Sequence, residues 1–135
     1  PNRTLLGLIG NSDAHAKNIS FIHGENGTTL APFYDLLSTY VYPYAKKMAM
    51  KIGGGRHFQF LESKHFERFS QDTQIKYKVV KETVMMMANK IVVEAKITTE
   101  AFSDLYGKSP VLNEINEVIN NSSKEKLKTF SRKII

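Results

Sequence analysis

The polar stretch from Asn11 to Asn18 contains two residues, Asp13 and Asn18, whose types and spacing could do chemistry. The stretch lies between two apolar segments, residues 5–9 and 19–22, which we expect to be buried. Four residues separate Asp13 from Asn18, as in the D-x-x-x-x-N pattern of a protein-kinase catalytic loop. In such a loop the Asp accepts the proton of the substrate hydroxyl, and the Asn holds a Mg²⁺ ion on the ATP phosphates. Alone, the spacing is weak evidence, because a chain of this length with 4 Asp and 9 Asn residues has about 0.27 such matches by chance.

A second acidic residue, Asp35, follows a predicted β-hairpin. The apolar segment 19–22 is followed by Gly-Glu-Asn-Gly at 24–27 and by Thr-Thr-Leu at 28–30, which is a strand, turn and strand pattern. Such a hairpin would return Asp35 to the neighbourhood of Asn18. Carboxylate and amide oxygens are the hard ligands that Mg²⁺ prefers. The alternative is that these side chains only form turns, through hydrogen bonds to nearby backbone.

Three stretches of this region occur in order at fitting spacings: Asn11 to Ser20, Leu30 to Thr39 and Met48 to Gly54. Together they resemble the HipA family of bacterial toxin kinases. The resemblance implies a serine/threonine protein kinase of a type II toxin–antitoxin system, which uses ATP and Mg²⁺ and acts on aminoacyl-tRNA synthetases. It also implies an antitoxin of the HipB type as partner, with contact to operator DNA through the complex.

The same resemblance assigns roles to individual residues. Asp13 would be the catalytic base. The nucleotide-binding residues would be His15, Lys17, Asn18, Tyr34 and Asp35, and two of them, Asn18 and Asp35, would also be the metal ligands. Tyr34 could instead belong to the core. A zinc-ligand role for His15 is discounted, because no second His or Cys stands at ligand spacing.

The length of 135 residues fits a single domain, 1–135, with one core. In kinases a Gly-rich phosphate loop and a strand lysine precede the catalytic loop, but here only twelve residues precede Asp13. We therefore expect the C-terminal lobe of a longer HipA-like kinase, with the N-lobe absent from this chain and the fragment alone inactive. The alternative is a non-catalytic interaction module that associates with an antitoxin or with DNA.

Composition excludes several classes of protein. The absence of Cys excludes disulfides and thiolate metal sites and agrees with a reducing cytoplasm. No apolar run approaches the length of a membrane span, and no signal peptide is visible, so we expect no membrane partner. The formal charge of +6 favours an anionic partner, although a solvated basic surface is the simpler interpretation.

Hydrophobic spacing after residue 62 predicts helices, so the expected fold is mainly α, a kinase-like C-lobe with one small hairpin at the catalytic and metal loop. Ser63 is predicted to cap a first helix, and a second is expected at about 74–95, with an apolar stripe that suggests a largely internal helix. Pro110 is predicted to open a third helix that is interrupted or ended at 120–123. Ser123 would then cap a last helix with these basic residues: Lys124, Lys126, Lys128, Arg132 and Lys133.

Overall fold

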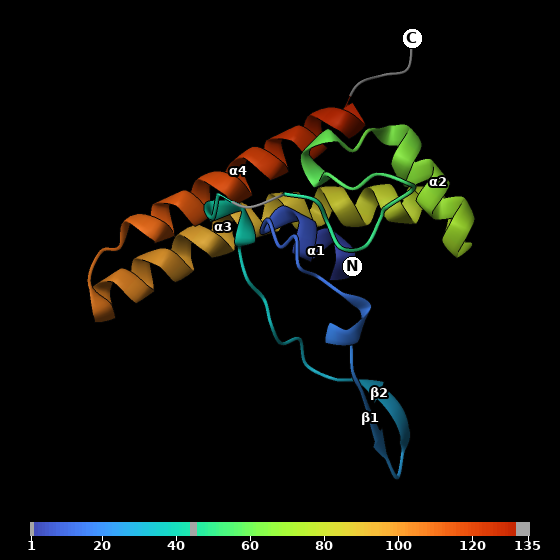
Figure 1. Ribbon diagram of the computed structural model, residues 1–135, viewed down its shortest axis with the longest axis horizontal. Coiled ribbons are helices and arrows are strands. Elements are labelled where there is room, and N and C mark those ends of the chain that lie inside the picture. Colours follow the sequence, from blue (N-terminus) through green and yellow to red (C-terminus); the bar gives the residue numbers. More distant parts are fainter. Residues whose placement is uncertain (1, 44–45, 132–135) are drawn as a thin grey trace.

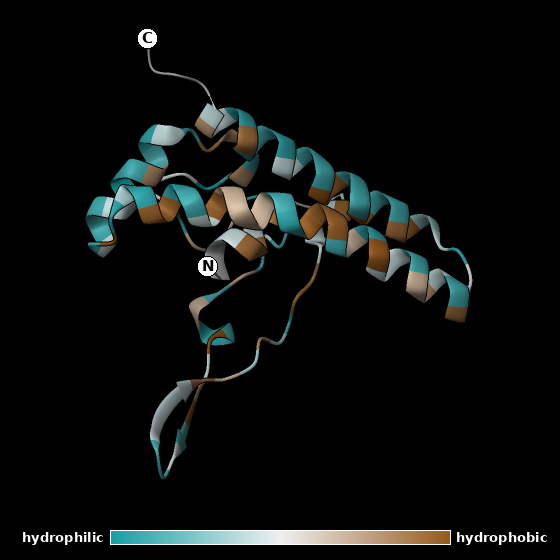
Figure 2. Cartoon of the chain, turned by 180° about the vertical axis from the view of Figure 1, so that it is seen from behind, coloured by the Kyte–Doolittle hydropathy of each residue, from teal (hydrophilic) through white to brown (hydrophobic). Residues whose placement is uncertain are grey.

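Two long antiparallel helices, α3 (Tyr77–Tyr106) and α4 (Pro110–Ser131), form the frame of the computed structural model (Figure 1). Helix α2 (Ser63–Thr73) packs against α3, and the short helix α1 (Asn2–Leu8) contacts both long helices. Apolar and polar stretches alternate along α3 and α4 (Figure 2), as expected of helices that bury one face. The predicted mainly helical fold is confirmed.

The predicted β-hairpin is also present. Strands β1 (Phe21–Gly24) and β2 (Gly27–Leu30) pair antiparallel, and Phe21 lies opposite Leu30. The hairpin projects away from the helices (Figure 1). Three short 3₁₀ helices lie in the connections: η1 (Ala16–Asn18), η2 (Thr39–Val41) and η3 (Phe58–Phe60).

The structure describes residues 2–43 and 46–131. Within these two ranges, no helix combines the length and the apolar character that crossing a bilayer would take.

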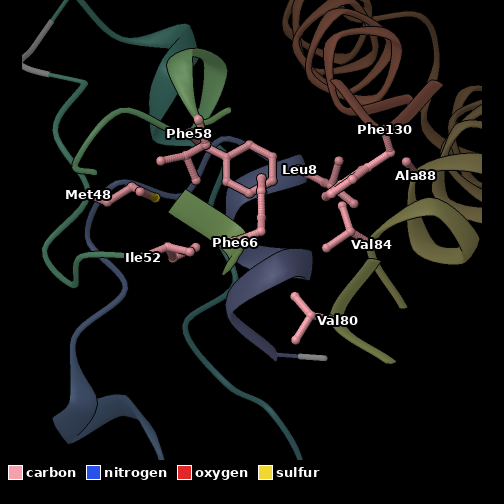
Figure 3. Close-up of a cluster of buried hydrophobic side chains, with 10 residues drawn as sticks. Leu8, Met48, Ile52, Phe58, Phe66, Val80, Val84, Ala88 and Phe130 are labelled. Carbon is pink, nitrogen blue, oxygen red and sulfur yellow. The ribbon is translucent and has the colours of Figure 1, made fainter. Parts of the chain in front are cut away.

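A single apolar cluster joins α1, the segment 48–61 and the three longer helices. Leu8 and Phe58 are fully buried in it, and the ring of Phe66 lies 5.0 Å from that of Phe130 (Figure 3). Because the cluster holds α1 against the long helices, it also fixes the start of the polar loop that follows α1. The buried members are Leu8, Met48, Ile52, Phe58, Leu61, Phe66, Val80, Val84, Ala88 and Phe130.

The ends of two helices differ from their predicted positions. Ser63 is the first residue of α2 and not its cap, because its hydroxyl donates to Thr129 O of α4 (3.2 Å). Gln74 has a left-handed backbone that ends α2, so α3 begins at Tyr77 and runs well beyond residue 95. Helix α3 is also less internal than predicted, since Met86 is 61% exposed.

The predicted break within α4 is wrong, because the helix continues through residues 120–123. Ser122 and Ser123 are buried inside it, and α4 packs there against the 3₁₀ segments η2 and η3. The weak helix propensity of Asn and Ser is a small cost, which this packing outweighs. Ser123 therefore caps nothing, and Arg132 and Lys133 of the predicted basic helix lie outside the described residues.

Lys126, predicted as one of the basic residues of a last helix, is fully buried. Its Nζ donates to Leu61 O (2.7 Å) and Gln59 O (3.2 Å). The ammonium group also lies over the rings of Phe58 (5.2 Å to the centroid) and Phe66 (6.0 Å). Lys126 thus ties α4 to the chain around η3, and it contributes no charge to the surface.

Stability is expected to depend on pH through Lys126. Burial lowers the pKa of Lys126 from 10.5 to about 8, an effect that the nearby charges of Glu125 and Glu62 partly offset. Between these two pKa values the unfolded chain holds a proton that the folded chain has released, so the free energy of unfolding should rise with pH. The full shift corresponds to on the order of 3 kcal/mol. Urea unfolding between about pH 8 and pH 10 would measure the rise.

Lys126→Met should flatten this rise, and Lys128→Met is a matched control, because Lys128 is exposed on the same helix. Burial raises the pKa of Tyr40, so above about pH 10 Tyr40 loses its proton more readily in the unfolded chain and the free energy of unfolding should fall. The pH range that tests Lys126 therefore ends at about pH 10. An equal pH dependence in wild type and Lys126→Met would contradict the role given to Lys126.

Candidate functional site

The polar loop that begins at Asn11 leaves α1 through a left-handed glycine. Gly10 has φ +73°, and a Cβ at this position would clash with neighbouring side chains. Gly10 N donates to Gly7 O (3.2 Å) and Asn11 N donates to Leu6 O (2.8 Å). These are the two hydrogen bonds of a Schellman motif, which ends α1 and sets the direction of the loop.

The segment after the hairpin holds the start of this loop from the other side. Thr39 Oγ1 accepts a hydrogen bond from Ser12 N (2.8 Å) and donates one to Gly10 O (3.0 Å). Tyr40 N also donates to Gly10 O (3.1 Å), and Ala49 N donates to Ser12 O (2.9 Å). Backbone contacts on both sides therefore fix the residues that precede Asp13.

Asp13 points its carboxylate toward solvent and toward His15. The side chain is 68% exposed, and its Oδ1 lies 2.9 Å from His15 Nε2. His15, predicted to contact nucleotide, is thus in direct contact with the predicted base. An exposed carboxylate held by one imidazole is accessible to a substrate hydroxyl and has a defined orientation.

Asn18 and Asp35 are in contact, as the predicted hairpin requires. Asn18 Nδ2 donates to Asp35 Oδ2 at 2.7 Å, although 17 residues separate them in the chain. Asp35 has φ +57°, a left-handed conformation that it shares with Gln74 among the described non-glycine residues. The predicted proximity of Asn18 and Asp35 is confirmed.

Tyr34 and Lys17 meet at the end of the same loop. The Tyr34 hydroxyl donates to Lys17 O (3.1 Å) and lies 2.8 Å from Ser20 Oγ. Tyr34 is 47% exposed, so it is not a core residue, and the Lys17 side chain is also exposed. Tyr34 therefore stabilises the loop backbone through its hydroxyl, while about half of its surface stays exposed.

A small pocket brings most of these residues together. Its lining includes His15, Asn18, Tyr34 and Asp35, together with the buried side chain of Asn11. Asp13 stands beside the pocket through its contact with His15. Apolar side chains complete the wall: Leu6, Ala14, Ile19, Phe33 and Leu36.

The oxygen donors of this pocket fit a Mg²⁺ ion that arrives with a nucleotide. Mg²⁺ is commonly held by one or two carboxylates together with substrate phosphates and waters. Asp35 supplies a carboxylate and Asn18 can supply its amide oxygen. Within residues 2–43 and 46–131 there is no group of three or more His, Asp or Glu side chains that could hold a metal by itself. The site is suited to a shared ion and not to a cage made only of protein ligands.

One expectation about this region is wrong. The apolar segment 19–22 was expected to be buried, but Phe21 is 60% exposed and Ile22 is 52% exposed. Both lie on the projecting hairpin, which has no further strand or helix packed over it in the described part of the chain. The polar loop therefore lies between one buried segment and one exposed segment.

Comparison with known proteins shows the family to which the chain belongs. The model of the HipA-like C-terminal domain matches residues 4–95, which include the whole pocket. The chain belongs to the HipA-like C-terminal domain family. The resemblance inferred from the sequence motifs is thereby confirmed.

Two individual proteins are similar to this HipA-like chain. "Putative kinase Y4mE" of Sinorhizobium fredii (strain NBRC 101917 / NGR234) is 30% identical over 118 residues, which are 87% of this chain and 28% of the relative. HipA in the HipA, HipB and operator DNA complex of Shewanella oneidensis MR-1 shares its fold, with a TM-score of 0.75 and 19% identity over 95% of this chain and 30% of that one. The HipA-like chain thus spans less than a third of either protein.

Asn11 and Thr39 are site residues that sequence reasoning missed. Both stand inside the motifs of the HipA family, but neither has a chemical group that suggests catalysis. The sequence signal for Asn11 was its position directly after the glycine that follows an apolar segment. In a Schellman motif the residue at this position packs back against the helix, and Asn11 is buried there.

Proposed function

We propose that this chain is the C-terminal lobe of a HipA-like serine/threonine protein kinase, which transfers the γ-phosphoryl group of ATP to a protein hydroxyl. The observation that supports this most is the contact between Asn18 and Asp35, in the loop that also presents Asp13. In a kinase the two metal-binding residues must lie close to each other and beside the catalytic base. Membership of the HipA-like family and the similarity to Y4mE point the same way.

In this mechanism Asp13 is the general base. It accepts the proton of the substrate hydroxyl as the hydroxyl oxygen attacks the γ-phosphorus of ATP. The bond from that phosphorus to the β,γ-bridging oxygen breaks, and ADP leaves. His15, at 2.9 Å, orients the Asp13 carboxylate, and the exposed ammonium group of Lys17 provides positive charge for the phosphates.

Asn18 and Asp35 would hold Mg²⁺ through the amide oxygen of one and the carboxylate of the other. The ion, when bound, neutralises charge on the phosphate oxygens. Asn18 now donates to Asp35 through Nδ2, so rotation of its amide group would turn Oδ1 toward the shared ion. Tyr34, partly exposed in the lining of the pocket, would contact the nucleotide.

The partners proposed for this kinase follow from its family. A HipB-type antitoxin and operator DNA are the components of the complex that contains the Shewanella HipA. We extend that association to the present protein, with an aminoacyl-tRNA synthetase as the proposed substrate.

The 135-residue chain by itself is expected to transfer no phosphate and to bind Mg²⁺·ATP weakly. In a kinase a Gly-rich loop and a strand lysine, both ahead of the catalytic loop in sequence, bind the phosphates from the opposite side, and neither stands ahead of Asp13 in these 135 residues. Calorimetry would measure the affinity. A dissociation constant of about 1 μM would contradict the expected weak binding, because it corresponds to roughly 8 kcal/mol of binding free energy from this lobe alone.

The second candidate function is a non-catalytic module that binds an antitoxin or DNA. It is favoured by the formal charge of +6, which suits an anionic partner. A longer protein containing this chain distinguishes the two functions, because only a kinase loses phosphotransfer when Asp13 is changed.

A further inference from the structure

The side chain of Asn11 joins the two loops that make the site. It is 3% exposed, and both ends of its amide group are used. Nδ2 donates to Asp35 O at 3.1 Å, across 24 residues of sequence, and Oδ1 accepts from Asp13 N at 3.0 Å. One buried group therefore contacts the backbone of the proposed base and the backbone of a proposed metal ligand.

Asp35 relies on such contacts because its backbone is left-handed. This conformation costs most L residues about 1–2 kcal/mol, and Asp and Asn adopt it more readily, so the neighbouring contacts decide whether it persists. Two described side chains bond to Asp35: Asn18 contacts the carboxylate and Asn11 contacts the backbone oxygen. The bond from Asn18 must be given up when its amide turns toward a metal ion. The hydrogen bond from Asn11 can remain, since its acceptor is the backbone oxygen of Asp35 and not the carboxylate.

We propose that Asn11 is the positioning residue of this site: its amide group holds Asp35 in the left-handed conformation that turns the carboxylate toward Asn18, and holds the backbone of Asp13 in register with it. The role rests on the proposed function, because it concerns how the site would receive a metal ion. Asn11 touches neither substrate nor metal in this mechanism. It acts through the two aspartates.

The chemistry of an amide suits this role, and a carboxylate supplies only half of it. Asn offers an N–H donor for Asp35 O and an oxygen acceptor for Asp13 N. Asn11→Asp keeps the size and the acceptor, but it removes the donor and places a carboxylate against a carbonyl oxygen. The substitution should therefore release Asp35 and leave the turn at Asp13 in place.

Nuclear magnetic resonance of the 135-residue chain tests this, with Mn²⁺ added together with ATP as the probe, because the site is suited to an ion shared with the phosphates. In wild type, Mn²⁺ should broaden the amide signals of Asn18 and Asp35. In Asn11→Asp the midpoint of the Mn²⁺ titration should rise about 10-fold or more, the usual cost of losing a group that orients a metal ligand. The backbone carbon shifts of Asp35 should also lose their left-handed signature, while the Asp13 amide signal changes little.

Asn89→Asp is a matched control, because Asn89 is exposed on α3 and donates only to Met85 O within its own helix. It should change neither the Asp35 shifts nor the Mn²⁺ midpoint. The proposal is overturned if Asn11→Asp also leaves both unchanged. If wild type itself shows no broadening, the proposed metal site fails, and the Asp35 shifts still decide the role of Asn11.

Stability gives a second measurement in case Asn11→Asp folds poorly. Glycine adopts φ +57° without strain, so Asp35→Gly should reduce the destabilisation caused by Asn11→Asp. A double-mutant cycle of urea unfolding would then show coupling between the two positions. Destabilisation by Asn11→Asp that is the same in both backgrounds would refute a role that acts through Asp35.

Discussion

Asp13→Asn in the proposed full-length kinase is expected to lower the rate of phosphorylation on the order of 10²-fold or more, the usual contribution of a positioned base. Asn has the size of Asp, and it keeps the backbone N–H that donates to Asn11 Oδ1. It also leaves an oxygen that can face His15, but it cannot accept the proton of the substrate hydroxyl. A phosphotransfer assay with radiolabelled ATP at saturating concentration measures the loss in kcat.

The loss should be specific to the chemical step. Asp13 is not a proposed metal ligand, so the KM for ATP should change little. Asp104→Asn is a suitable control, because Asp104 is an exposed carboxylate near the end of α3 and is remote in sequence from the loop. Near-wild-type turnover in Asp13→Asn would show that Asp13 is not the base. The non-catalytic function would then be the better account.

The elements of the site that could be predicted from sequence are those set by local chemistry. The spacing of Asp13 and Asn18 lies within one loop, and the turn of the hairpin is encoded by residues 24–27. Together they were enough to return Asp35 to Asn18. In the structure Glu25 and Asn26 are the central residues of the turn. Gly24 and Gly27, which were predicted as turn residues, belong to the ends of the two strands.

The contacts of Asn11 and Lys126 could not be predicted in this way, because their partners are distant in sequence. Asn11 meets Asp35 O across 24 residues, and Lys126 meets Leu61 O across 65. Both acceptors are backbone oxygens, which every residue carries, so nothing in the sequence identifies them. A lysine among other lysines on a helix resembles a surface residue until tertiary packing surrounds it.

Apolar residues on the hairpin and on α3 led to the opposite error. Phe21, Ile22 and Met86 were predicted to lie in buried segments, but all three are exposed. A hydrophobic pattern indicates which side chains favour burial, and it does not show which element packs over them. An isolated two-stranded hairpin is at best marginally stable in water. The exposure of these side chains therefore agrees with the proposal that the chain is one lobe of a larger kinase.

Asp35→Ala in the proposed full-length kinase is expected to lower phosphorylation at least as much as Asp13→Asn. The substitution removes the carboxylate, which is one of two proposed protein ligands of Mg²⁺, and leaves the amide of Asn18 without its partner at 2.7 Å. Alanine at φ +57° adds backbone strain of about 1 kcal/mol. Two effects are therefore combined in this variant, and a second substitution is needed to separate them.

Asp35→Asn makes that separation, because Asn tolerates a left-handed backbone better than Ala and differs from Asp mainly in charge. If metal binding is the main function of Asp35, then Asp35→Asn should also be severely impaired, and higher Mg²⁺ should restore part of its activity, since a neutral oxygen ligand remains. If backbone shape is the main function, Asp35→Asn should be nearly as active as wild type at any Mg²⁺ concentration. The Mg²⁺ dependence of phosphotransfer in the two variants, with Asp72→Asn on α2 as control, decides between a ligand and a structural turn.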